Sequence, residues 1–404
     1  MIDIGSLPVE TLLEILLNTN GVTLGRCRRV CKQWKAIIDE SDLIWYEICR
    51  KEFMYSSRIA KSKAGDECSW YHIYKNLRMW CSVTSFQRNI REFYNFSLHD
   101  KNHALPINYN VLPLKDTRGV VLYDMATLKN IPVSVPERNC LKVESNDSVT
   151  VILLKSGLFL QRTVQSEGEM SEAFFNADNF ILTCDVLYFY NNRDVYRCEI
   201  KPNNLSSHLI LHCDYDIKVM QYDDGTLHLF TDCGRIVNVG KDKKVTVKSI
   251  DCPPEWVRQI KHICVINDKN FVCYSRNLFK IETSKYQHLY LDFPLITALF
   301  FYADIVLIGT KTGQILLYRL ASQKVATKPI FEEIAVLPNG KFAVHIDVCE
   351  RKTGPVIVIG TFFKIMVIEI DFFPHEKEKK TSFGSSKLRM YKRLLRLRDR
   401  LKVS

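Results

Sequence analysis

The sequence predicts a small α-helical domain followed by a larger all-β domain built from repeated units. Apolar residues recur at helical spacing up to about Cys81 and then form short β-rich runs, broken by turn residues, as far as about Phe373. Equivalent runs recur at intervals typical of a repeat architecture. With 404 residues, 47% hydrophobic and 25% charged, the chain has an ordinary globular composition, which argues against a mainly disordered protein.

The net charge of +11 is concentrated at the C-terminal end. Residues 375–404 contain eleven Lys and Arg residues and three acidic residues, a net +8, which leaves +3 for the rest. The N-terminus lacks the features of a signal peptide, and no apolar run approaches the ~18 residues of a membrane span. The fourteen cysteines are scattered and form no C-x-x-C pair. We therefore expect an intracellular protein, cytoplasmic or nuclear, with reduced cysteines.

Four helices are expected within the first 81 residues. Pro8 suits the first turn of a helix because that turn needs no N–H donor. Thr23 and Ser41 are the candidate N-caps of the second and third helices, since a hydroxyl oxygen can accept from the N–H groups at a helix start. The apolar stripes at steps of three and four residues span residues 9–16, 24–38, 43–53 and 70–80.

The first three of these helices resemble the F-box motif, in register over roughly residues 4–53. The matching positions are Leu7, Pro8, Glu10, Leu12, Ile15, Leu16, Val30, Cys31, Trp34, Leu43 and Trp45. The link over residues 18–23 departs from the pattern, because it is polar and contains a glycine. The resemblance implies an F-box domain over residues 1–54 that uses these eleven positions to bind the Skp-type adaptor of a cullin-RING ubiquitin ligase.

From the residues alone, the stripes have a second interpretation, in which they pack only against one another. A set of helices this small has too little core to hide all of its apolar residues, so a partner is expected to cover some of them. Cys27 and Cys31 form an i, i+4 pair, but no further ligand stands at zinc spacing. We therefore expect this pair to pack rather than to bind a metal.

The β-rich zone repeats with a regular period. Strand endings beginning at residues 120, 158, 195, 236, 278, 315 and 365 are separated by 38, 37, 41, 42, 37 and 50 residues. Periods of about 40 to 45 residues with four short strands are typical of propeller blades, so seven endings predict seven blades. We expect the ring to close by pairing of the last blade with a strand from the start of the zone, which removes the open edges.

This zone resembles a WD-repeat β-propeller through its period and through the hairpin over residues 304–320, which turns at Gly313. It lacks the Gly-His and Trp-Asp dipeptides, and Tyr318-Arg319 stands where a Trp-Asp is expected. A pair of β-sandwiches is the alternative fold. An F-box followed by a propeller resembles the substrate receptors of SCF (Skp-cullin-F-box) ubiquitin ligases. The resemblance implies a helical linker over residues 55–82 and a target-binding propeller over residues 83–373.

No catalytic constellation is found in the sequence. His208 and His212 have the spacing of a metalloprotease pair, but the glutamate is missing and the residues between them predict a strand. The sequence contains no G-x-G-x-x-G, P-loop or G-x-S-x-G motif. We therefore expect a non-catalytic protein without a cofactor or metal, and we assign no substrate-binding residue from the sequence.

The C-terminal segment, residues 374–404, is predicted to be a basic helical tail. Met390, Leu394, Leu397 and Leu401 follow one another at helical steps among the lysines and arginines. Such a helix can bind an anionic membrane surface, a nucleic acid backbone, an import receptor or an acidic partner, and the alternative is a solvated helix. Three functions stay open: a ligase substrate receptor, a scaffold that binds the adaptor without ubiquitination of a target, and a nucleic-acid or membrane tether that acts through the tail.

Overall fold

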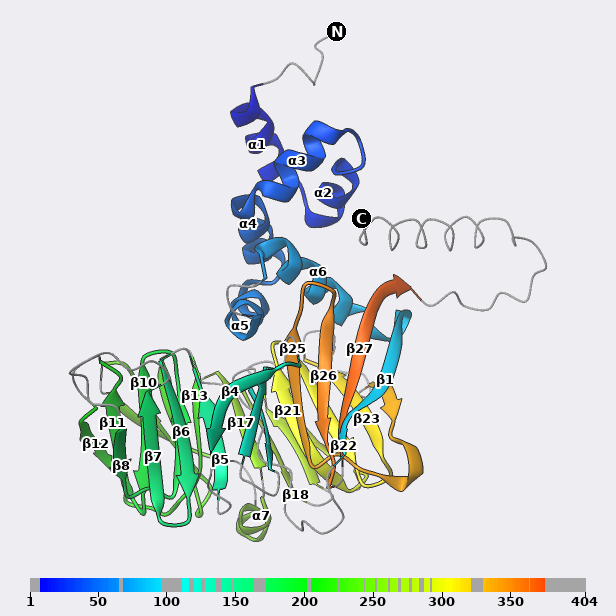
Figure 1. Cartoon of the computed structure of the whole chain (residues 1–404). Coiled ribbons are helices and arrows are strands. Elements are labelled where there is room, and N and C mark those ends of the chain that lie inside the picture. The colour runs from blue at the N-terminus through cyan, green and yellow to red at the C-terminus, as the bar shows by residue number, and fades with distance from the viewer. Residues whose placement is uncertain are drawn as a thin grey trace.

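The computed structural model shows a group of helices standing on one end of a ring of β-sheets (Figure 1). It describes residues 8–374, except 65–67, 96–110, 116–119, 125–127, 136–139, 147, 163–171, 202–204, 224, 243, 251–252, 261, 268–269, 276–277, 283–286, 291–292, 321–329 and 363. Leu7 and the predicted basic tail lie outside the described residues. In the part of the chain that is described, no helix has the length and apolar run needed to cross a bilayer.

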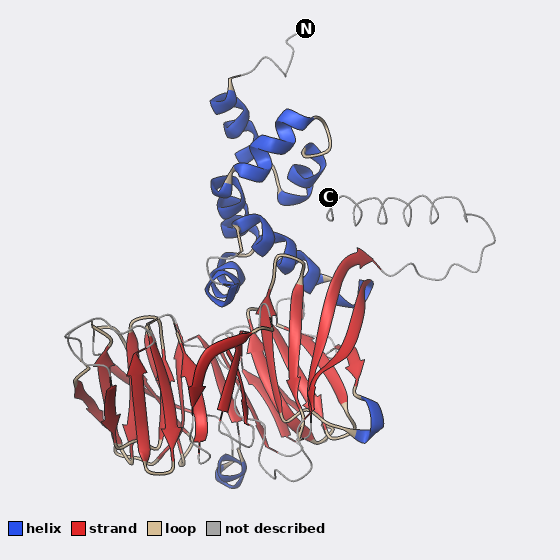
Figure 2. Ribbon diagram, in the orientation of Figure 1, coloured by secondary structure: helices blue, strands red, loops and turns tan. Residues whose placement is uncertain are grey.

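The N-terminal region contains six helices among its described residues, rather than the four predicted. They are α1 (Val9–Leu17), α2 (Gly21–Cys27), α3 (Lys32–Glu40), α4 (Asp42–Glu52), α5 (Met54–Ala64) and α6 (Trp70–Cys81). The additional α5 escapes sequence analysis because its buried residues, Ser56, Ser57 and Ala60, are small or polar and form no apolar stripe. Figure 2 shows that these six helices and the strands occupy separate parts of the molecule.

The predicted second helix is interrupted. Its stripe over residues 24–38 is divided between α2 and α3, because the backbone of Cys31 is extended and its Sγ caps α3 by accepting from Trp34 N at 3.4 Å. The prediction that Thr23 caps the first part is also wrong. Asn20 is the N-cap, and its Oδ1 accepts from Thr23 N at 2.8 Å. The predicted cap at Ser41 is confirmed, with its hydroxyl accepting from Ile44 N.

The strands form seven antiparallel sheets among the described residues. The first three sheets along the chain are β2 (Val111–Lys115), β3 (Val120–Asp124) and β4 (Asn130–Val135); β5 (Cys140–Ser145), β6 (Val149–Leu154), β7 (Gly157–Arg162) and β8 (Glu172–Phe175); and β9 (Asn179–Leu182), β10 (Val186–Asn191), β11 (Asp194–Glu199) and β12 (Ser207–His212).

The remaining four sheets each have four strands. They are β13 (Ile217–Asp223), β14 (Thr226–Thr231), β15 (Arg235–Val239) and β16 (Val245–Ser249); β17 (His262–Asn267), β18 (Asn270–Ser275), β19 (Leu278–Glu282) and β20 (Gln287–Tyr290); β21 (Ile296–Tyr302), β22 (Ile305–Thr310), β23 (Gln314–Arg319) and β24 (Phe331–Val336); and β25 (His345–Glu350), β26 (Pro355–Gly360), β27 (Lys364–Pro374) and β1 (Phe86–Asn95). A short helix, α7 (Pro254–Gln259), connects β16 to β17.

The predicted count of seven regular blades needs correction. Five sheets, those beginning with β5, β9, β13, β21 and β25, are four-stranded blades whose packing is described along most of each strand. The β2–β4 sheet has three strands among the described residues. In the β17–β20 sheet, side-chain packing is described only for Ile263 and residues 279–281. Five complete blades are therefore established.

The predicted repeat positions and ring closure are confirmed. The strand endings identified from the period lie in β3, β7, β11, β15, β19, β23 and β27, and six of these are the third strand of their sheet. The strand β1 joins β27 in antiparallel register, with Ile90 opposite Ile368. The N-terminal strand of the β zone thus completes the C-terminal blade, which leaves the ring without a break at the chain ends.

Hydrophobic clusters join the sheets into a propeller rather than a pair of sandwiches. One cluster combines Leu153 and Leu160 with Phe180 of the next sheet, and another combines Ile281 with Val306. The largest cluster runs from the α1–α6 helices into the sheets of β21 and β25. Since apolar burial is the main stabilising force, this shared core fixes the helices to the propeller.

Candidate functional site

The predicted adaptor-binding positions divide into an exposed set and a buried set. The exposed residues lie on α1, on the link before α3 and on α4: Pro8, Glu10, Ile15, Val30, Cys31 and Leu43. Ile15, Val30 and Leu43 are 47%, 65% and 61% exposed. Trp34 is half-buried. Three large aliphatic side chains in contact with water on so small a set of helices are the kind of surface that a protein partner covers.

The buried set holds the helices together. Leu12, Leu16 and Trp45 are at most 2% exposed and belong to one core cluster, and the indole Nε1 of Trp45 donates to Ile38 O at 2.8 Å. These side chains shape the helical surface from within. In the structure as it stands, they present no atoms to a partner.

Sequence analysis missed three exposed apolar residues in this region: Val22, Tyr46 on α4 and Met54 at the start of α5. Val22, at the start of α2, is 44% exposed and lies in the polar link where the sequence departs from the F-box pattern. For Val22, the only indication in the sequence was the departure from the F-box pattern at residues 18–23, and this departure argued against a contact with a partner there. Val9, included in the predicted stripe, is 45% exposed and faces water beside Pro8.

The helix α6 is fixed to the propeller by a buried carboxylate. Glu350, at the end of β25, is 1% exposed, and its Oε1 accepts from Trp80 Nε1 at 2.8 Å and from Tyr302 OH at 2.5 Å. Desolvation by burial raises the pKa of Glu350 and also the pKa of Tyr302. Next to this group, Asn76 donates to Arg351 O at 2.9 Å.

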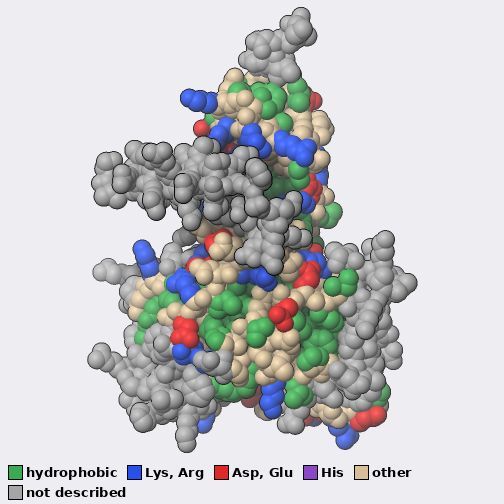
Figure 3. All heavy atoms as spheres, turned by 90° about the vertical axis from the view of Figure 1, so that its right-hand side faces the viewer, with side chains coloured by type: hydrophobic (Ala, Val, Ile, Leu, Met, Phe, Trp, Pro, Cys, Tyr) green, Lys and Arg blue, Asp and Glu red, His purple; other side chains and the backbone are tan. Residues whose placement is uncertain are grey.

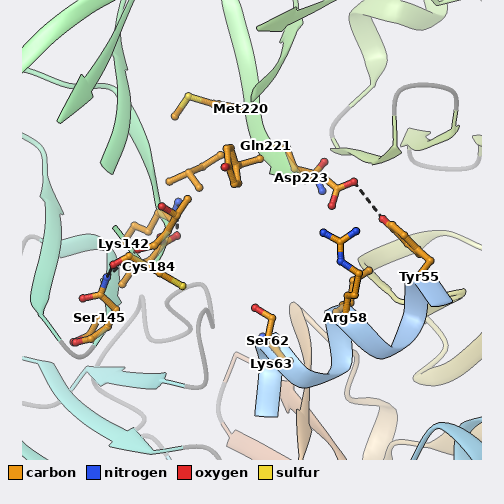
Figure 4. Close-up of a pocket in the computed structure, with 16 residues that line it drawn as sticks. Tyr55, Arg58, Ser62, Lys63, Lys142, Ser145, Cys184, Met220, Gln221 and Asp223 are labelled. Carbon is orange, nitrogen blue, oxygen red and sulfur yellow. Dashed lines mark hydrogen bonds and ion pairs between the residues drawn. The ribbon is translucent and has the colours of Figure 1, made fainter. Parts of the chain in front are cut away.

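The helix α5 crosses one end of the propeller and is attached near both of its ends. Lys63 forms an ion pair of 2.8 Å with Asp347, whose side chain is fully buried, on β25. At the other end, Tyr55 OH donates to Asp223 at 3.2 Å, at the end of β13. Because these contacts reach two separate blades, the position of α5 over the ring is defined by both of them; Figure 4 shows the contact between Tyr55 and Asp223.

A cavity of about 700 Å³ lies between α5 and the ends of β5, β9 and β13. Figure 4 shows Arg58 and Ser62 of α5 facing Lys142, Ser145 and Cys184 across it. Lys142 is neutralised by Glu144 at 2.8 Å. The lining combines apolar and polar side chains and carries both signs of charge, so it shows no preference for an anionic or a cationic ligand.

The histidine pair singled out in the sequence lies on β12, as predicted. His212 Nδ1 lies 2.6 Å from Asp194 Oδ1 on the neighbouring strand, and His208 is paired with Arg197 in the strand register. Among the residues that the structure describes, no group of three His, Cys, Asp or Glu side chains is placed to hold a metal ion.

These features define a class of protein: a small helical domain with exposed aliphatic side chains, fixed to one end of a β-propeller. Residues 4–51 match the family model described as F-box-like. The chain therefore has an F-box-like domain at its N-terminus, followed by a propeller. Human F-box/WD repeat-containing protein 8 is 26% identical over 151 residues, which is 37% of this chain and 19% of that protein. The match thus spans less than a fifth of that relative's length.

Solved structures similar to this chain share little sequence identity with it. Kluyveromyces lactis Hsv2 is 12% identical, with a TM-score of 0.45 over 63% of this chain and 87% of that one. A streptogramin B lyase is 9% identical, with a TM-score of 0.48 over 70% of this chain and 98% of that one.

Proposed function

We propose that this chain is the substrate-recognition subunit of an SCF ubiquitin ligase. Its F-box-like helices would bind the Skp-type adaptor, and through it the cullin and RING subunits, while the propeller would bind a target protein. The observation that supports this most directly is the exposure of Ile15, Val30 and Leu43 at F-box positions, on helices whose core is already filled by Leu12, Leu16 and Trp45. Such a receptor would act inside the cell, in the cytoplasm or the nucleus.

The proposed mechanism is proximity. A receptor that holds a target next to a ubiquitin-charged enzyme raises the effective concentration of the target lysine, and it needs no catalytic group of its own. The contacts of Glu350 with Trp80 and of Lys63 with Asp347 support this role, because they fix the helices on the propeller. A fixed angle keeps the target at a constant distance from the enzyme. We therefore propose a non-catalytic subunit.

The proposed domain organisation follows the boundaries that were predicted from the sequence. Residues 1–54 would be the F-box domain, residues 55–82 a linker, residues 83–373 the propeller and residues 374–404 a basic tail.

The adaptor interface is tested with alanine substitutions at exposed F-box positions. We expect the combination Pro8→Ala, Ile15→Ala and Leu43→Ala to weaken binding of the purified Skp-type adaptor by at least tenfold, because each removes apolar area that a partner would cover. The melting temperature should stay within a few degrees, since these residues are exposed. Titration calorimetry measures the affinity, and circular dichroism measures the stability.

Val247→Ala is the matched control, because Val247 is 54% exposed on β16, away from the helices. Unchanged adaptor affinity in the triple variant would refute the proposed interface.

The scaffold alternative is tested by reconstitution. If the chain recovers the adaptor and the cullin, and if a co-purifying protein is ubiquitinated only when the chain is present, the receptor function is supported. Recovery of the complex without any ubiquitinated product would favour a scaffold.

A further inference from the structure

The two ends of the propeller are not equivalent. The cavity under α5 is lined by residues at the turns that follow the first strands β5, β9 and β13, such as Asn146, Thr183 and Asp223. Consecutive turns of an antiparallel sheet alternate between its two ends. The turns between second and third strands, and the links between sheets, therefore lie at the other end, which we call the distal face. Figure 1 shows this face at the lower end of the strands, where α7 also lies.

The distal face carries an aromatic pair. Phe342, in the link between β24 and β25, and Phe362, in the turn between β26 and β27, meet edge to face with ring centroids 5.5 Å apart. Phe362 is nevertheless 52% exposed. Leu295, which precedes β21, is 42% exposed, and its carbonyl accepts from Lys311 N at 2.8 Å. Apolar side chains that remain in water at the tips of turns are suited to contact with a partner.

Lysines surround these apolar side chains. Lys311 is exposed in the turn between β22 and β23. The link between β24 and β25 lies close to this turn, since a Cβ added at Gly313 would be only 2.6 Å from the carbonyl oxygen of Lys341. Lys341 Nζ lies 3.8 Å from Glu92, and Lys364 contacts the same carboxylate. We call Leu295, Lys311, Lys341, Phe342, Phe362 and Lys364 the basic-aromatic patch.

The patch has a positive balance of charge. Lys341 and Lys364 share one described acid, Glu92, whose pKa is lowered by the hydrogen bond from Lys364. A second acid, Glu333, lies beside the turn that holds Lys311, where it accepts from Gln314 Nε2 at 2.9 Å. Three lysines against these two carboxylates leave a positive balance. On the other side of the distal face, Asp178, Asp216 and Asp232 are exposed in the turns and links of the β9–β12 and β13–β16 sheets. Arg193 pairs with Asp216 at 2.7 Å and Arg235 is also exposed there, so that side carries both signs of charge. Figure 3, seen from the side of β1 and β27, shows hydrophobic and charged side chains interspersed over the flank next to the patch.

We propose that the basic-aromatic patch is the target-binding site of the propeller and that it takes an acidic peptide segment carrying an aromatic or large aliphatic side chain. This inference rests on the proposed receptor function. The apolar side chain packs against Phe362 and Leu295, and the acidic groups of the peptide lie over Lys311 and Lys341. The end of the propeller covered by α5 is already occupied by the chain's own helix.

The test uses three fluorescein-labelled peptides and the full chain bound to the adaptor. One peptide alternates Glu with Phe, the second has Lys in place of every Glu, and the third has Ser in place of every Phe. We expect the first to bind and the others to bind at least tenfold more weakly, measured by fluorescence anisotropy. Phe362→Ala, and separately Lys311→Glu with Lys341→Glu, should each weaken binding of the first peptide about tenfold, as expected when an interface side chain that contributes more than about 1 kcal/mol is removed.

Two control variants make the result specific. Phe174→Ala removes a phenylalanine of the same 52% exposure from β8, on the propeller flank, and should leave binding unchanged. Arg58→Glu changes the cavity under α5 and should also leave binding unchanged. Binding that is lost in Arg58→Glu and kept in Phe362→Ala would place the peptide under α5 and overturn the proposal. Equal binding of all three peptides would overturn it as well.

The outcome separates this inference from the receptor function. If the chain binds the adaptor but shows no preference for the acidic aromatic peptide, the patch is refuted and the adaptor interface stands. If the chain does not bind the adaptor, the receptor function fails whatever the peptides do.

Discussion

Glu350 illustrates how one buried carboxylate can connect two parts of a chain. Its oxygen accepts hydrogen bonds from Trp80 of α6 and from Tyr302 of β21, so a helix and two blades meet at one side chain. Burial of an ionised group is costly unless hydrogen bonds compensate, and here burial raises the pKa of the carboxyl group. Glu350 therefore both attaches α6 to the propeller and makes the stability of the protein depend on pH.

Glu350→Gln is expected to change how stability depends on pH. The pKa of Glu350 in the folded protein is raised above 4.5, so the folded state takes up a proton before the unfolded state as the pH falls. The contribution of this group to stability therefore grows from neutral pH down towards 4.5, with a slope of at most about 1.4 kcal/mol per pH unit for one proton. The variant loses that slope. Its stability relative to the wild type should be greatest at neutral pH and should decline as the pH falls.

Urea unfolding between pH 5 and 8 measures this difference. Asp347 is also buried, and burial raises its pKa. Its contribution to the pH dependence is to first order the same in the wild type and in Glu350→Gln, so it cancels when the stability of one protein is subtracted from that of the other. Glu333→Gln, at an exposed residue, is the control. A constant difference between Glu350→Gln and the wild type across this range would contradict the assignment.

At the scale of single elements, α5 shows what hydrophobic periodicity cannot reveal. The helix buries Ser56, Ser57 and Ala60, which are small enough for close approach to the neighbouring helix but give no apolar stripe. Its position depends on long-range partners, with Lys63 bound to Asp347 and Tyr55 bound to Asp223. Partners so distant in sequence could not be paired without coordinates.

Lys63→Ala should loosen α5. The substitution leaves the carboxylate of Asp347 buried without its ion-pair partner, a change that typically costs about 3–5 kcal/mol. We expect faster amide hydrogen exchange over residues 54–64, measured by mass spectrometry, with smaller changes in β5–β8.

Lys63→Ala combined with Asp347→Asn should recover much of the loss, because the amide removes the buried charge and its oxygen can still accept from Val348 N. Exchange over α5 that is equal in the wild type and Lys63→Ala would show that the ion pair does not hold the helix.

At the scale of the whole molecule, closure of the ring is the dominant feature. The strand β27 lies between β26 and β1, so its hydrogen bonds connect the C-terminal blade to the strand that follows the helices. The same blade carries Asp347 and Glu350, the anchors of α5 and α6. Closure of the propeller and attachment of the helices therefore depend on a single sheet.

Val367→Pro should destabilise the whole propeller. Val367 is fully buried in β27, and proline removes a ladder donor between two paired strands. We expect loss of the cooperative thermal transition measured by circular dichroism. Thr246→Pro is the control, because Thr246 is exposed on the outer strand β16, where one side of the backbone has no neighbouring strand in its sheet. Similar melting curves for the two variants would argue against a special role of the closing blade.

The sequence by itself determined the elements whose signal is local. Apolar steps of three and four residues located α1, α4 and α6, glycine turns and β-branched runs located the strands, and the F-box positions were recognisable because the motif lies within 50 consecutive residues. Tertiary structure decided what depends on distant neighbours. It divided the F-box positions into core and surface, placed α5 over one end of the propeller, gave the β2–β4 sheet three strands and brought Phe342 and Phe362 together. Burial and contact are set by packing between residues far apart in the chain, and a one-dimensional pattern does not contain those distances.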